Sequence, residues 1–421
     1  MTSAGAQGTT QGDGPGGPSR DPLVGRGFAV MLLTAIAAFT GLHSLLSVVP
    51  LWAAAGGSNQ QGAGLTTGVF MLTTVSTQPL VPWLISRAGY RAAFSIGLVL
   101  LGAPAPLYAV SAHIGPVLGV SAVRGIGFGI VTVTGAALVA ELAPPARRGE
   151  GQGLYGLAIA VPNLLALPLG VWIAQNVGFS PAFWLGAAPL VGLVGTAAMG
   201  DVQRAGGGGR DRQSRTQPGT ERRVPWKHRR AAGVLVLVPA ALPLACGTVA
   251  SGGLVTFLPF AFGGTPGVAS AALFVIAGTS AASRWLSGRV SDRLGPGRLL
   301  APGVILTVLG LLGPAAGAYV GDLTGTVALL AGLVVFGTGL GVIRGETLVL
   351  AFARSSPERY GTASAVWNVA FDAGTGVGAF ALGAAVVGYG YAAAFLIAAG
   401  GVLVGLPVAL RIRRAPAATP P

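Results

Sequence analysis

Residues 288–298 read GRVSDRLGPGR, and four of these eleven residues are charged. The stretch stands between two long apolar runs, at 271–286 and 299–313, in a chain whose charged fraction is only 9%. Charges packed into one short turn between two apolar runs indicate a connection between two membrane-spanning segments, because charge inside the bilayer is costly.

The composition supports the same interpretation. Soluble domains carry about 25% charged residues, whereas this chain has 12 acidic and 26 basic residues in 421. This number of charges is too small to cover the surface of a soluble protein of this size. We therefore predict an all-α, polytopic membrane protein. Its single cysteine, Cys246, excludes an internal disulfide framework and a cysteine-based metal site.

Apolar runs long enough to cross a bilayer as helices recur along the chain. A spanning helix needs about 20 mostly apolar residues, and only helices or closed barrels satisfy the backbone in lipid. The runs predict twelve transmembrane helices, six before and six after a polar break, at 28–50, 65–86, 92–111, 116–142, 151–174, 180–199, 231–260, 267–288, 299–319, 324–352, 361–387 and 389–410.

The basic residues give the orientation. Only Arg124, Arg284 and Arg344 fall inside the predicted spans, and the connections after odd-numbered spans hold no Lys or Arg. By the positive-inside rule both termini are cytoplasmic. An alanine- and arginine-rich composition is typical of bacteria with GC-rich genomes, so we expect a multi-pass protein of a bacterial cell membrane.

The polar segments divide the chain into five parts. Residues 1–25 are expected to form a disordered cytoplasmic tail, 26–200 a first six-helix bundle, 201–230 a basic cytoplasmic linker, 231–411 a second bundle and 412–421 a terminal tail. The linker has no aromatic platform or binding fold, so its charge indicates a solvated loop near anionic lipid rather than nucleic-acid binding.

The two halves repeat each other. A shift of 212 places the glycines of GIGFG (125–129) on those of GTGLG (337–341), and places Gly178 on Gly390. Near a shift of 206, SRAGYR (86–91) parallels SDRLGPGR (291–298). Two similar six-helix halves predict pseudo-two-fold symmetry, with a ligand site between the halves near the midplane. Within apolar spans, the glycine runs indicate close helix packing.

With this organisation in place, GRVSDRLGPGR resembles the cytoplasmic loop signature of the major facilitator superfamily. Its positions are filled by Gly288, Asp292, Arg293, Gly295 and Arg298. RGIGFG (124–129) resembles the Arg-containing motif of the family's fourth helix, and ELAPPARRGEGQG (141–153) and ARSSPERYGTASA (353–365) resemble its loops before helices five and eleven. The resemblance implies a twelve-helix transporter in which the charged loop acts as a cytoplasmic latch that must open during the cycle.

The first-half copy of the latch departs from the family pattern. Pro82 and Ser86 stand where glycine and aspartate are expected, while Arg87, Gly89 and Arg91 remain. We therefore expect the two halves to contribute unequally to cytoplasmic closure. The fifth helix, VPNLLALPLG (161–170), matches the glycine-rich antiporter signature of the family only in part and contains Asn163.

Ionisable residues inside spans are costly and usually functional. Arg344 and Asp372 lie about 15 Å and about 20 Å from the cytoplasmic ends of consecutive helices, so we expect them to pair near the midplane. Glu346 follows Arg344 by two residues, about 200° around the helix, and should face away from it, with Arg284 as one possible partner. Each charge either fixes helix packing or handles substrate and protons.

Other residues complete the predicted path. The family motif implies a functional role for Arg124, and His43 lies in helix 1, which lines the cavity in this superfamily. His43 either titrates near neutral pH or stays neutral and hydrogen-bonded. Trp367 and Asn368 border a glycine run and are candidates for the substrate wall, although Trp367 could equally serve packing.

These observations predict a secondary transporter that exports a small organic molecule in exchange for protons. The alternatives are a proton-linked importer and a non-transporting membrane sensor on the same fold. The sequence has no metal-ligand cluster, catalytic triad or nucleotide loop, so we expect no enzyme activity, no cofactor and no metal. We expect a monomer in the lipid bilayer whose partners are a small, moderately apolar or zwitterionic substrate and protons.

Overall fold

The structure is a computed structural model that describes residues 25–142, 148–198, 226–264, 267–320, 322–355 and 360–414. Helices, without strands, make up the regular structure of these residues. The first half contains α1 (Arg26–Leu46), α2 (Val48–Ala55), α3 (Gln60–Thr77), η1 (Gln78–Leu80), α4 (Val81–Gly102), η2 (Ala105–Val110), α5 (Ile114–Leu142), α6 (Arg148–Asn176), α7 (Phe179–Leu185), η4 (Ala188–Val191) and α8 (Gly192–Ala198). The second half contains α10 (Trp226–Ala261), α11 (Val268–Leu294), α12 (Leu300–Val320), α13 (Leu323–Ala353), α14 (Tyr360–Leu403) and α15 (Leu406–Arg414).

Nine helical segments among the described residues are long and apolar enough to cross a membrane. Two of them, Gln60–Val110 and Ala363–Ile412, have 51 and 50 residues, enough for two crossings each. Helix α11, with 27 residues, also has spanning length but carries several charges. Divided in this way, the helices fit the twelve crossings predicted from the sequence. Of the predicted linker, residues 226–230 belong to α10, and 201–225 lie outside the described residues.

Glycines with positive φ make several of the turns that separate these crossings. Gly89 (φ 80°) breaks α4 between the second and third crossings, and Gly390 (φ 78°) breaks α14 between the last two. Their repeat partners, Gly295 (φ 90°) and Gly178 (φ 130°), occupy equivalent turns. Glycine adopts these angles without the penalty that a side chain would incur, so the repeat seen in the sequence corresponds to a repeated backbone geometry.

The repeated glycine runs pack helices closely, as predicted. A Cβ on Gly127 of α5 would collide with the backbone of α4, and one on Gly125 would meet Phe70 of α3. In the second half Gly339 of α13 touches the backbone of α12 in the same way. The fourth and tenth crossings thus each pack between the two crossings that precede them in their own half. The helix backbones come close together at the glycines because these residues have no side chain.

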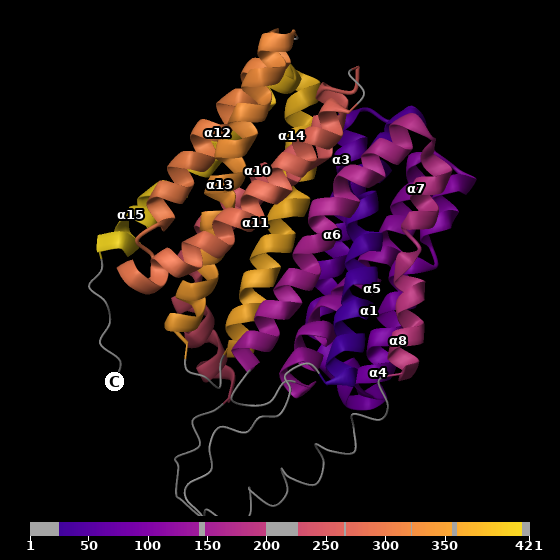
Figure 1. Cartoon of the computed structure of the whole chain (residues 1–421), viewed down its shortest axis with the longest axis vertical. Coiled ribbons are helices and arrows are strands. Elements are labelled where there is room, and N and C mark those ends of the chain that lie inside the picture. The colour runs from indigo at the N-terminus through magenta and orange to yellow at the C-terminus, as the bar shows by residue number, and fades with distance from the viewer. Residues whose placement is uncertain are drawn as a thin grey trace, which may run out of the picture.

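The two halves touch mainly at one end. We call the end that carries Arg26, Arg91, Arg289 and Arg298 the basic end, and the other the opposite end. Helix α3 lies against α14 and α6 against α11, side by side in Figure 1. Gln60, at the opposite end of α3, donates a hydrogen bond to the Tyr391 hydroxyl, with its nitrogen 3.5 Å from that oxygen.

Core packing shows the same asymmetry. Leu45, Val48 and Val171, at the opposite end of the first half, belong to one hydrophobic cluster with the second half. Residues nearer the basic end, such as Phe28 and Phe94, form a separate cluster within the first half. Helix α4, which continues the second crossing to the basic end, makes no comparable contact with α14 over the described residues. The halves are therefore closed at the opposite end and parted at the basic end.

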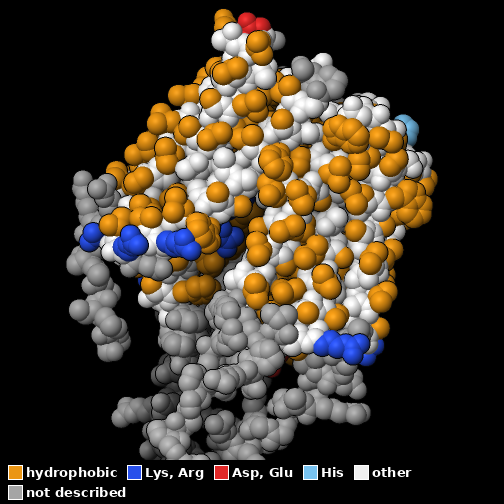
Figure 2. Space-filling view, in the orientation of Figure 1, with side chains coloured by type: hydrophobic (Ala, Val, Ile, Leu, Met, Phe, Trp, Pro, Cys, Tyr) orange, Lys and Arg blue, Asp and Glu red, His pale blue; other side chains and the backbone are white. Residues whose placement is uncertain are grey.

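The surface fits a molecule surrounded by lipid. Figure 2 shows hydrophobic side chains over the flanks, while Lys and Arg gather in a row at mid-height on the left and in a group at the lower right. Trp83 and Trp285 are about 60% exposed, and each carries an arginine of its own helix over its ring, Arg87 at 5.2 Å and Arg289 at 3.7 Å. Such pairs are typical of a membrane–water boundary, where amphipathic rings and snorkelling cations sit.

Candidate transport path between the two halves

Asp372 lies where the two halves begin to part. It is on α14, 5% exposed, and its carboxylate accepts a hydrogen bond from Gln78 Nε2 at 2.7 Å. Gln78 opens η1, at the basic-end side of α3, so this bond joins the first half to the second. Sequence reasoning missed Gln78, although an amide within an apolar crossing is a signal that could have found it.

The expected pair between Arg344 and Asp372 is wrong. The Arg344 guanidinium lies over the ring of Phe371, with its central carbon 4.6 Å from the ring centroid, and Asp372 binds Gln78 instead. Similar depth in the membrane did not bring the two charges together because the rotation of each helix about its own axis decides where a side chain points. Phe371 and Asp372, adjacent on α14, consequently face different neighbours.

Glu346 points away from Arg344, as its spacing predicted, but Arg284 is not its partner. Its carboxylate accepts hydrogen bonds from the Ser291 hydroxyl and from the backbone N–H of Gly297, the latter at 2.6 Å. Both donors belong to the GRVSDRLGPGR stretch. Glu346 is 1% exposed, so it holds the connection between α11 and α12 from inside the second half. It does not line the space between the halves.

His43 lies on α1 in contact with Phe39. Its Nδ1 is 2.9 Å from the Phe39 carbonyl oxygen, and since a carbonyl only accepts, Nδ1 carries the proton and Nε2 is free to accept. The His43 ring is close enough to Arg344 for the arginine's charge to act on it. His43 is thus a buried side chain hydrogen-bonded within α1, and its role in transport stays a prediction.

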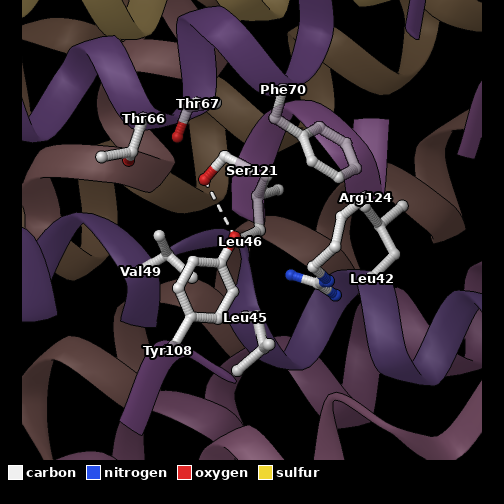
Figure 3. Close-up of a pocket in the computed structure, with 10 residues that line it drawn as sticks. All are labelled: Leu42, Leu45, Leu46, Val49, Thr66, Thr67, Phe70, Tyr108, Ser121 and Arg124. Atoms are coloured by element: carbon white, nitrogen blue, oxygen red, sulfur yellow. Dashed lines mark hydrogen bonds between the residues drawn. The ribbon is translucent and has the colours of Figure 1, made fainter. Parts of the chain in front are cut away.

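Arg124 is bound inside the first half. Its Nε donates to the Leu101 carbonyl at 2.9 Å and its Nη2 to the Gly41 carbonyl at 2.8 Å. Figure 3 shows its guanidinium directed towards Tyr108, whose hydroxyl is 2.9 Å from Ser121 Oγ. Arg124 therefore ties α1, α4 and α5 together.

These groups line a small pocket within the first half (Figure 3), formed by Leu42, Leu45, Leu46, Val49, Thr66, Thr67, Phe70, Tyr108, Ser121 and Arg124. All of these residues come from the first four crossings. The pocket is thus built by the first half alone.

The remaining predicted wall residues lie in different settings. The Trp367 indole N–H donates to Thr347 Oγ1 at 3.0 Å, across from α14 to α13. The Asn368 amide donates back to the Ser364 carbonyl of its own helix at 2.9 Å. Asn163 is half-buried on α6. The Trp367 ring also lies under the Arg284 guanidinium, with 5.7 Å between the guanidinium carbon and the ring centroid.

The predicted latch residues lie at the basic end. Gly288 lies within α11, Arg293 and Arg298 are exposed, and Gly295 makes the turn that ends the helix. The Asp292 side chain lies outside the described part of the structure. In the first half, Gly89 turns the chain, Arg91 is exposed and Arg87 lies over Trp83 of its own helix.

Comparison with known proteins identifies the fold. The family model of the Major Facilitator Superfamily matches residues 31–379 and 262–421. Solved structures of similar shape are a D-xylose-proton symporter (TM-score 0.71, 15% identity, 93% of this chain and 97% of that chain) and an inward-facing bacterial homolog of the human lysosomal transporter Spinster (TM-score 0.69, 14% identity, 93% and 98%).

Relatives in sequence are matched only over short segments. The uncharacterized MFS-type transporter YhcA of Bacillus subtilis (strain 168) is 26% identical over 130 residues, 31% of this chain and 24% of its own length. Multidrug resistance protein 3 of the same organism is 22% identical over 119 residues, 28% and 23% respectively. The matched segments thus span about a quarter of these relatives. Since the family model covers nearly the whole chain, the protein belongs to the Major Facilitator Superfamily.

Proposed function

We propose that this protein is a secondary active transporter that exports a small organic molecule in exchange for protons. Two bundles that touch at one end and part at the other suit alternating access, in which the halves rock about a central site. The partial similarity to Multidrug resistance protein 3 favours export. The structural similarity to a D-xylose-proton symporter makes proton-linked import the second candidate.

The orientation follows from the positions of the arginines. If the basic end is cytoplasmic, as the positive-inside rule requires, the parted end opens to the cytoplasm and can load cargo there. A cysteine replacing Gly62, in the Cys246→Ala background, should react with an impermeant maleimide from outside, and one replacing Gly219 only after permeabilisation. The reverse pattern would refute this orientation.

The hydrogen bond between Asp372 and Gln78 is the observation on which the coupling mechanism rests. A donor stabilises an ionised carboxylate, and a dry environment stabilises the protonated acid. The donor belongs to one half and the acceptor to the other, so rocking of the halves changes the balance between the two forms. A proton can then be taken up in one conformation and released in the other.

Everted membrane vesicles test this coupling. The vesicles come from a host that lacks its main efflux pumps, and respiration acidifies their interior, which quenches the fluorescence of an acridine dye. Aromatic carboxylates, neutral aromatics or aromatic cations are then added, and a recovery of fluorescence reports proton movement out of the vesicles. We expect at least one class to reverse the quenching with the unmodified protein. Asp372→Asn should abolish this reversal yet still permit substrate exchange at equal pH, because exchange moves no net proton.

Asp322→Asn is the matched control. Asp322 is a carboxylate at the opposite end that caps α13 through the Gly325 N–H, and asparagine caps equally well, so this variant should behave like the unmodified protein. Normal gradient-driven transport by Asp372→Asn would exclude proton coupling through this residue. Alkalinisation of the medium when the compound is added to intact cells would indicate symport, and proton movement in neither assay would favour the sensor alternative.

A further inference from the structure

Two arginines share one aromatic surface in the second half. Trp367 and Phe371, one turn apart on α14, stack with ring centroids 5.6 Å apart and planes 15° apart. The Arg344 guanidinium of α13 lies 4.6 Å from the Phe371 centroid, and the Arg284 guanidinium of α11 lies 5.7 Å from the Trp367 centroid. Three helices thus converge on a patch that carries two positive charges.

Neither charge has a counter-ion among the described side chains. Arg284 and Arg344 are close enough for their charges to repel each other, and the buried Arg344 Nε has no hydrogen-bond partner among the described residues. The two nearest acids in sequence are engaged elsewhere, since Asp372 binds Gln78 and Glu346 binds the α11–α12 connection.

An arginine nitrogen buried without a partner is energetically costly. Leaving a buried donor unpaired costs about 1–3 kcal/mol, and more for a charged group, whereas a cation–π contact contributes about 0.5–2 kcal/mol. The aromatic rings therefore orient the guanidinium groups without fully compensating their burial. The missing interaction is one that an anion would supply, and the planar guanidinium fork fits a carboxylate in particular.

The patch is accessible and reaches both halves. Arg284 is exposed on α11, and Figure 2 shows the surface hollowed between the bundles beside Lys and Arg side chains. His43, from the first half, lies within electrostatic reach of Arg344. A ligand held on Arg344 would therefore meet groups from both bundles, as a transported substrate must.

We infer that Arg344, Arg284, Trp367 and Phe371 form the binding site for a small aromatic carboxylate. The carboxylate is held by the two guanidinium groups, and its ring packs beside the Trp367–Phe371 pair. This inference names a substrate class for the proposed transporter. It rests on the proposed function in one respect, namely that the transport path runs between the two halves. The substrate is then an anion, rather than the zwitterionic or moderately apolar molecule expected from composition.

Binding to the purified protein in neutral detergent, at equal pH and in Bis-Tris chloride buffer, provides the test. The four probes are benzoate, benzamide, benzylammonium and acetate. Benzoate should raise the unfolding temperature and change the tryptophan fluorescence, and the fluorescence change should disappear in Trp367→Phe. Benzamide, benzylammonium and acetate should have no effect at the same concentration. Equal binding of the amide or the amine would overturn the anion site, and equal binding of acetate would overturn the aromatic part.

Arginine variants locate the site. Arg344→Gln should weaken benzoate binding about 10- to 100-fold, as expected for the loss of a charged hydrogen bond. Arg289→Gln removes the same charge and a similar stack, on Trp285, but at the surface, and should change binding by no more than about twofold. If Arg344→Gln fails to fold, Arg284→Gln takes its place. Unchanged benzoate binding in the folded variant would refute the assignment.

This test is independent of the coupling test. Benzoate binding that depends on Arg344, without gradient-driven transport, would retain the site and refute the proton antiport. Proton-coupled export of a cation, without benzoate binding, would retain the antiport and refute the site.

Discussion

Gly64→Ala should shift the protein towards a conformation that is open at the opposite end. Gly64 of α3 faces the second half, where an added Cβ would collide with the backbone carbonyl oxygen of Ala379, lie 2.9 Å from its carbon and lie 3.3 Å from the Phe257 ring. Both neighbours belong to the other bundle. The strain therefore arises only while the two halves are closed at this end.

The size of the shift follows from the contact. Overpacking costs about 1–3 kcal/mol, and the backbone of Ala379 cannot rotate away as a side chain could. The gain in helix propensity from glycine to alanine, about 1 kcal/mol, is the same in both conformations and cancels. Because 1.4 kcal/mol corresponds to a factor of ten, the ratio of the two conformations should change by about 5- to 150-fold.

Distances between spin labels measure this ratio. In a Cys246→Ala background, labels at Val110 and Tyr319, both more than 80% exposed, report the opposite end, and labels at Ala92 and Leu294 report the basic end. Gly64→Ala should lengthen the first distance and shorten the second.

Gly119→Ala serves as the control, since a Cβ there meets no atom within 4 Å, and it should leave both distances unchanged. If Gly64→Ala also leaves both distributions unchanged, the reasoning from this interface is refuted.

Further predictions concern the basic end and the helix packing. Glu346→Gln should speed hydrogen exchange at the Gly297 N–H, because the amide oxygen can accept from only one of the two donors that the carboxylate binds. Glu141→Gln, at an exposed position, is the control and should leave this exchange unchanged. Unchanged exchange at Gly297 in Glu346→Gln would contradict the anchoring role. Gly127→Ala should be less stable than Gly119→Ala on the same helix by about 1–3 kcal/mol, measured by thermal unfolding, and equal stabilities would argue against the close contact with α4. Asp292→Asn should lower transport and favour opening of the basic end in the spin-label assay while folding is retained; if neither changes, the latch role fails and only an orientation signal remains.

Much of the fold could be predicted from the sequence because it depends on local quantities. The length and polarity of each run decide whether a helix can cross lipid, and Gly89, Gly178, Gly295 and Gly390 mark turns because only glycine adopts positive φ without strain. The glycines of α5 and α13 predict close packing, since a missing side chain permits contact whatever the neighbour. The repeat between the halves, and hence the two-bundle architecture, follows from the same positions.

The partners of the charged residues were decided only by the tertiary structure. Depth along a helix follows from counting residues, but a side chain's partner depends on how each helix is rotated and how the bundles meet. Arg344 therefore lies over Phe371 instead of pairing with Asp372, Glu346 binds Gly297 instead of Arg284, and Asp372 bonds to Gln78, 294 residues away. Some of these contacts join consecutive helices and one joins the two halves, but the geometry of each is set by helix rotation and by the packing of whole bundles.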